Sequence, residues 1–197
     1  MNWKLFFNPF EKFSEIQLLV FGIIITILGS FIGSSLGVIY DGVFDVHVYQ
    51  TTFAQAILVN FINILSVFVP LLILGKIINS RTRIIDILNV SLISRFPIYI
   101  AGLLANNEKM NGITENILKE INTPEKLQIP TTDLVYLMVF SSLMMLFLVY
   151  SIVLMVSGFR TATNVKKWQH FIFFAIAIIV AELISKVTIG ILLDFWQ

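Results

Sequence analysis

Five long apolar runs restrict what this chain can fold into. A helix that crosses a bilayer needs about 20 consecutive apolar residues, and each run meets that length. The whole chain is 57% hydrophobic and 13% charged, whereas soluble domains carry about 25% charged residues. The sequence therefore predicts an all-α integral membrane bundle of five transmembrane helices, at residues 18–40, 53–78, 84–105, 134–159 and 168–193.

The third run is the least regular, because Asp86, Asn89, Arg95 and Pro97 interrupt it. The distribution of lysine and arginine supports counting it as a span, since these residues concentrate on the cytoplasmic side of membrane proteins. With five spans and a cytoplasmic N-terminus, the inner segments hold Lys4, Lys12, Lys76, Arg81, Arg83, Arg160, Lys166 and Lys167. The outer segments hold only Lys109, Lys119 and Lys126. We therefore predict a cytoplasmic N-terminus and a C-terminus on the outside.

Two segments lie outside the predicted membrane domain or connect its spans. Residues 1–17 place Phe6, Phe10 and Phe13 on one helical face, which predicts a cytoplasmic interfacial segment interrupted at Pro9. Residues 18–197 form the five-span membrane domain.

The 106–133 connection is long for a bare loop. Its isoleucines Ile113, Ile117 and Ile121 share a helical face, and a Thr-Pro pair at 123–124 follows them. We expect a short amphipathic helix on the outer surface that ends at this pair.

Charged and amide side chains form a predicted polar layer inside the membrane. Counting along the spans places Arg95 halfway across, Glu182 slightly beyond halfway and Lys186 further outward, with Asn60 and Asn63 of the second span at matching depths. An unpaired charge at the centre of a spanning helix costs roughly 2.5–3.5 kcal/mol. We therefore expect Glu182 to bridge Arg95 and Lys186 in a shared ion triad.

The polar layer has two interpretations. It is either a wet cavity for an anionic group or an ion, or a structural network that fixes how the third and fifth spans pack. No second deep acid or histidine continues a proton path from Glu182, so we favour the structural interpretation. If the triad forms, Glu182→Gln should weaken assembly, because two buried cations would lose their counter-charge.

Gly29, Gly33 and Gly37 repeat every four residues near the end of the first span. Small residues at this spacing let two helix backbones approach closely in a membrane. The partner is either another helix of the same chain, which we favour, or a second copy in a homodimer.

Several classes of site are disfavoured. The chain has no cysteine, and its two histidines, His47 and His170, fall on opposite faces of the predicted topology. Asp41, Asp45 and His47 share one outer loop that could bind a cation weakly, but we expect a solvated loop and predict no metal or cofactor. The net charge of +1 gives no basis for nucleic-acid binding. No hydrolase, zinc-protease or phosphate-binding motif is present, so we predict that the protein is not an enzyme.

Three stretches carry a family resemblance: "FFNPFEKF" before the first span, "SRFPIYI" in the third, and "GFRTATNVKKWQ" after the fourth. Together with the five-span layout, they resemble a minimal bacterial member of the Yip1-domain family. The resemblance implies a cytoplasmic N-terminus and the bacterial cytoplasmic (inner) membrane. Eukaryotic relatives act in vesicle traffic and have a longer N-terminal region with a DLYGP-type motif, which this sequence does not contain.

These observations favour a non-enzymatic scaffold or adaptor in a membrane complex or in membrane organisation. Its expected partners are the lipid bilayer and a membrane protein or a second copy of itself. The alternative is a small transporter, or a protein that moves lipids or ions, that uses the polar layer. A dry, fully paired layer would favour the scaffold, and a wet, outward-opening cavity at Glu182 would favour transport.

Overall fold

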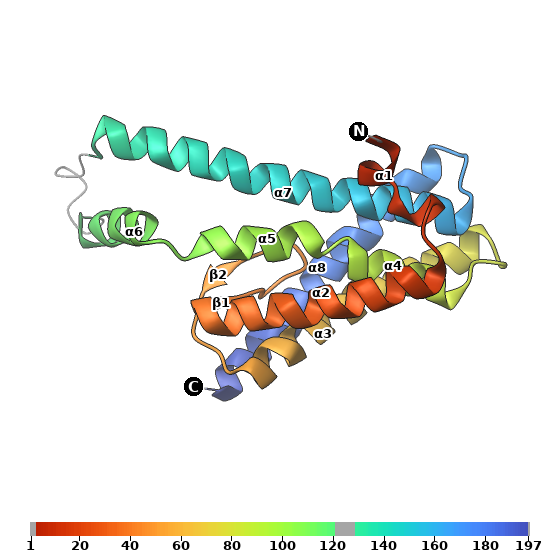
Figure 1. Ribbon diagram of the computed structural model, residues 1–197, viewed down its shortest axis with the longest axis horizontal. Helices are drawn as coiled ribbons and strands as arrows, with labels where there is room; N and C mark the ends of the chain where they lie inside the picture. Colours follow the sequence, from red (N-terminus) through yellow and green to blue (C-terminus); the bar gives the residue numbers. More distant parts are fainter. Residues whose placement is uncertain (1–2, 121–128, 197) are drawn as a thin grey trace.

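Five helices in the described part of the chain are long and apolar enough to cross a membrane. The computed structural model describes residues 3–120 and 129–196 (Figure 1). The spanning helices are α2 (Glu15–Leu36), α3 (Phe53–Ile78), α4–α5 (Ile84–Ile93 and Phe96–Ala105), α7 (Thr131–Thr163) and α8 (Gln169–Trp196). The predicted all-α membrane bundle is thus confirmed, whereas its orientation in the membrane stays a prediction.

Helix α2 begins and ends at residues with recognisable capping chemistry. The Ser14 hydroxyl accepts from the Gln17 N–H and the Gln17 side chain accepts from the Ser14 N–H, a capping box. The helix ends at Gly37, whose φ of 64° is left-handed and favours glycine. The first span therefore runs from Glu15 to Leu36, not from 18 to 40.

The third span is broken into two helices at Ser94 and Arg95. Pro97 lacks an N–H and so cannot donate to the carbonyl of Ile93, but it is tolerated in the first turn of α5. The break leaves the Ser94 carbonyl to accept a 2.6 Å hydrogen bond from the Ser151 hydroxyl of α7. This span is the most buried of the five and contacts α2, α3 and α7.

The connection between α2 and α3 folds into the bundle as a hairpin. Its strands are β1 (Val38–Ile39) and β2 (His47–Val48), paired antiparallel with Val38 opposite Val48. Val43, in the turn between them, is fully buried and belongs to the same apolar cluster as Val67, halfway along α3. We call residues 38–48 the inserted hairpin. The expectation of a solvated loop at Asp41–His47 is wrong for its tip, because Val43 and Phe44 are apolar and pack into the core.

The two segments outside the bundle are helical. The N-terminal segment forms α1 (Trp3–Phe7) and a 3₁₀ turn, η1 (Pro9–Glu11), interrupted before Pro9 as expected. The 106–133 connection contains helix α6 (Glu108–Glu120), with Ile113 buried, and its location on the outer surface stays a prediction. Ile121 and the expected end of this helix at 123–124 lie outside the described residues. Figure 1 shows α6 and the start of α7 together at one end of the molecule.

Candidate functional site

The polar layer surrounds the tip of the inserted hairpin. Backbone that is neither helix nor closed barrel is tolerated at membrane depth only where protein or water satisfies its hydrogen bonds. Three side chains do so here, one from each of three spanning elements. They are Asn63 on α3, Arg95 at the α4–α5 break and Glu182 on α8.

Arg95 is fully buried and contacts the hairpin directly. Its Nη1 donates to the Val43 carbonyl at 2.9 Å, its Nη2 to Asn60 Oδ1 at 3.3 Å and its Nε to the Tyr99 hydroxyl at 3.2 Å. Its guanidinium also lies 5.4 Å from the centre of the Tyr99 ring, within cation–π range.

Asn60 and Asn63 are both fully buried and link separate elements. Asn60 donates to the Ser30 hydroxyl of α2 at 2.9 Å and accepts from Arg95. Asn63 donates to the Tyr40 carbonyl at 2.6 Å and accepts from the Ser185 hydroxyl of α8. Each amide therefore uses its donor and its acceptor in the protein interior, which is what a buried polar group requires.

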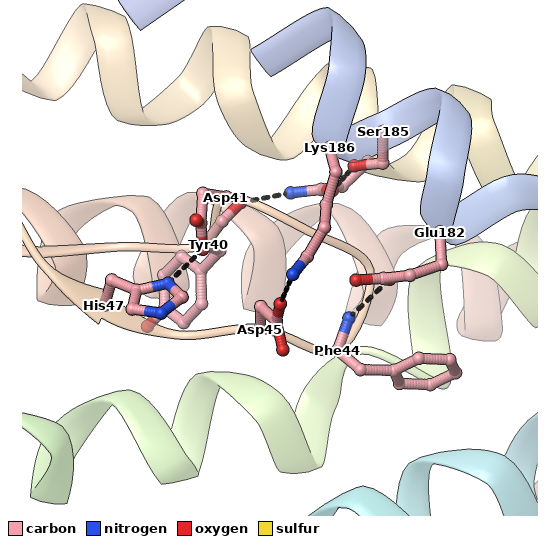
Figure 2. Close-up of polar contacts among 9 residues, drawn as sticks. Tyr40, Asp41, Phe44, Asp45, His47, Glu182, Ser185 and Lys186 are labelled. Atoms are coloured by element: carbon pink, nitrogen blue, oxygen red, sulfur yellow. Dashed lines mark hydrogen bonds and ion pairs between the residues drawn. The ribbon is translucent and has the colours of Figure 1, made fainter. Parts of the chain in front are cut away.

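Glu182 and Lys186 of α8 contact the hairpin turn at Phe44 and Asp45 (Figure 2). Glu182 accepts from the Phe44 N–H at 3.2 Å, and the Lys186 ammonium pairs with the Asp45 carboxylate. This side of the layer is more open, since Lys186 is 47% exposed and Asp45 35%. Beside it, His47 and Asp41 form a pair at 2.7 Å.

The predicted ion triad is not formed. Within the described residues, Arg95 and Glu182 share no ion pair, and Lys186 pairs with Asp45 in place of Glu182. Arg95, Glu182 and Lys186 all contact the inserted hairpin, which lies between them. The sequence signal for this hairpin is the apolar Val43–Phe44 pair after Gly42, which is unusual in a solvated loop.

The glycine series packs within the same chain. A Cβ at Gly29 would lie 2.5 Å from the ring of Tyr99, and one at Gly33 would lie 2.8 Å from the Val38 carbonyl oxygen. The missing side chain at Gly29 thus leaves room for the Tyr99 ring, whose hydroxyl accepts from Arg95 Nε. Gly37 differs from the other two, because it ends α2 and its neighbour is the side chain of Gln50, which precedes α3.

The described residues contain no group of three histidine, aspartate or glutamate side chains placed to hold a metal ion. Asp41 and His47 face each other, but Asp45 is turned toward Lys186 (Figure 2). The chemistry of this site is hydrogen bonding to an inserted backbone segment.

Comparison with known proteins adds one finding. No curated protein and no solved structure matches this chain significantly. The family model of the Yip1 domain, however, matches residues 3–188, which include the N-terminal segment, all four connections between spans and most of the last span. The chain is therefore a multi-pass membrane protein that belongs to the Yip1 domain family.

Proposed function

We propose that this protein is a non-catalytic scaffold or adaptor in a membrane complex, placed in a bacterial cytoplasmic membrane. The observation that supports this role most directly is the complete burial of Arg95, Asn60 and Asn63, with their hydrogen bonds made to the protein itself. A transport site needs polar groups that a substrate can reach. In this bundle the deepest polar groups hold the inserted hairpin in place.

The outer end of the molecule offers a surface for a partner. Helix α7 has 33 residues, about a dozen more than the roughly 20 needed to cross a bilayer. Two contacts of Tyr136 join the first turns of α7 to the start of α6. Its hydroxyl donates to Asn107 Oδ1 at 2.8 Å, and the Lys109 ammonium lies 4.5 Å from the centre of its ring. Leu118 of α6 is 59% exposed. We infer that this end contacts another membrane protein.

Site-specific crosslinking tests the scaffold role. A photoreactive amino acid at Leu118 should give discrete protein adducts in native membranes. A matched control at Ile77 should give none of the same adducts. Ile77 is 75% exposed and lies at the C-terminal end of α3, away from α6. Identical patterns at both positions, or adducts at neither, would count against a partner at the α6 end.

A second candidate, movement of a lipid or an ion, is favoured only by the more open side of the polar layer at Lys186 and Asp45. Purified protein in liposomes distinguishes the two roles. The scaffold predicts no ion flux and no lipid flip-flop above that of empty liposomes. Flux that is abolished by Lys186→Met would overturn the scaffold proposal and establish the second candidate.

A further inference from the structure

A polar pocket and an apolar groove meet at the end of the bundle where α2 begins. The polar pocket has a volume of 170 Å³ and is lined by Glu15, Arg83, Asp86 and Asn89, among others. The apolar groove has a volume of 570 Å³, within the roughly 300–1,000 Å³ typical of ligand sites. Phe13 and Leu18 line both, so the two spaces are neighbours.

The lining changes from polar to apolar in the same direction along three helices. On α2, Glu15 lines the pocket and Phe21 the groove; on the third span, Asn89 lines the pocket and Phe96 the groove. On α7, which runs the opposite way, Thr161 lines the pocket and Leu154 the groove. A phospholipid in this leaflet has the same polarity, with its headgroup at the ends of the helices and its chains towards the middle of the bilayer.

The N-terminal segment covers the groove. Leu5, Phe6 and Pro9 line it from this side. Phe6 is held against α7, because its ring stacks on Tyr150 at 4.4 Å between centroids and its carbonyl accepts from the Tyr150 hydroxyl at 3.0 Å. The groove therefore has walls from three spanning elements and an ordered cover, which distinguishes it from the exposed surface of a single helix.

The polar pocket carries one net negative charge. Arg83 pairs with Glu15 at 2.5 Å and donates to both oxygens of Asp86 at 2.9 and 2.7 Å, so one guanidinium faces two carboxylates. These acidic partners raise the pKa of Arg83, which keeps it charged. Its side chain is 60% exposed and lies at the rim of the pocket.

Asn89 supplies an unused acceptor in this pocket. It is 1% exposed, and its Nδ2 donates to the Glu15 carbonyl at 2.9 Å. Its Oδ1 has no hydrogen-bond partner in the part of the chain that the structure describes. Leaving a buried acceptor unpaired is unfavourable. The free acceptor and the net negative charge together call for a cationic group that also has N–H donors.

We propose that this site binds a phospholipid with a primary-amine headgroup, of the phosphatidylethanolamine type. Its ammonium group donates to Asn89 Oδ1 and neutralises the excess carboxylate, its phosphate lies near Arg83, and one acyl chain occupies the apolar groove. A choline headgroup cannot donate a hydrogen bond, and a glycerol headgroup brings negative charge to a negative pocket. This proposal does not rest on the scaffold role, because the same lipid could bind whether the protein is a scaffold or a transporter.

Photolabelling of the full chain tests this proposal. The protein is placed in phosphatidylcholine nanodiscs that contain a trace of a lipid with a diazirine in its acyl chain. Three probes share this chain and differ only in headgroup: ethanolamine, choline or glycerol. The ethanolamine probe should label the peptides that carry Phe21 and Phe96 several-fold more than the other two. Asp86→Asn should reduce this excess, and Asp133→Asn, at the opposite end of α7, should leave it unchanged.

Other outcomes overturn the proposal. Equal labelling by all three probes would mean that the groove holds ordinary bilayer lipid and the pocket only water. Stronger labelling by the glycerol probe would show that the pocket attracts anions. Labelling spread over the exposed face of α8, at Phe173 and Val187, would exclude the groove as a specific site. If Asp86→Asn fails to fold, Glu15→Gln repeats the test, and the headgroup comparison in the parent chain decides by itself.

Discussion

Arg95 and Val43 are 52 residues apart in the sequence, yet a 2.9 Å hydrogen bond joins the guanidinium of one to the carbonyl of the other. The bond fixes the tip of the inserted hairpin to the break in the third span. Both features interrupt regular structure inside the membrane, and each satisfies the other: the break positions a buried guanidinium, and the hairpin presents the carbonyl that accepts from it. The polar layer is therefore best understood as the support of a re-entrant segment.

Arg95→Lys should destabilise the protein although it keeps the charge. A single ammonium cannot reach Val43, Asn60 and Tyr99 together, and each buried acceptor left unpaired costs about 1–3 kcal/mol. The melting temperature in mild detergent should fall measurably. Arg160→Lys, at an exposed position, is the matched control and should melt like the parent. Equal melting of the two variants would contradict the role assigned to the Arg95 fork.

Glu182 should tolerate an amide better than an apolar side chain. Glutamine keeps an oxygen that can accept from the Phe44 N–H, whereas Glu182→Leu leaves that half-buried donor unpaired, at a cost near the lower end of the roughly 1–3 kcal/mol for a buried group. Melting temperatures of the two variants measure the difference. An ion triad would predict that Glu182→Gln weakens assembly, because the charge is lost. The hydrogen bond to the hairpin predicts instead that Glu182→Gln is tolerated. If Glu182→Gln were as unstable as Glu182→Leu, the result would support the ion triad.

Gly29→Ala should destabilise the bundle because the new methyl group would lie 2.5 Å from the Tyr99 ring. Overpacking of this kind costs about 1–3 kcal/mol. Gly190→Ala is the control, since a Cβ there meets nothing within 4 Å, and replacing a helical glycine gains roughly 0.5–1 kcal/mol. Thermal unfolding should separate the two variants in opposite directions. If Gly29→Ala instead left stability unchanged and altered the oligomeric state, the glycine series would be a dimer contact.

Gly158→Ala should release the N-terminal segment from α7. The added Cβ would lie 2.8 Å from the Phe10 ring and 2.6 Å from the Val90 side chain, so both neighbours have to shift, and the N-terminal segment that carries Phe10 is the one outside the five spanning helices. Trypsin should then cut after Lys12 faster than in the parent, while Gly190→Ala should not change the rate. Unchanged cleavage at Lys12 would mean that the Phe10 contact does not hold the segment. The same variant should weaken labelling of the lipid groove, which this segment covers.

The sequence predicts the spanning helices well because their signal is local. Length and apolarity within one run determine α3 at 53–78 and the ends of the third span at 84 and 105.

The polar layer was only partly predictable for a physical reason. Depth along a helix places Arg95, Glu182, Asn60 and Asn63 in one slab, but the partner of each depends on which backbone enters that slab. A loop that folds back between helices leaves little periodic pattern, and only the apolar Val43–Phe44 pair marked it.

Labelling of single cysteines should establish the orientation of the bundle and the depth of the hairpin in one experiment. The chain has no cysteine of its own, so each introduced thiol reports alone. Ser80 and Glu108 are exposed and lie in successive connections between spans. With a cytoplasmic N-terminus, a membrane-impermeant maleimide added to intact cells should label Glu108→Cys and spare Ser80→Cys. Labelling of Ser80→Cys but not Glu108→Cys would show that the N-terminus lies outside.

Val43→Cys should stay unlabelled from either side until the protein is denatured, because a solvated outer loop would react like Glu108→Cys and an inserted hairpin would not.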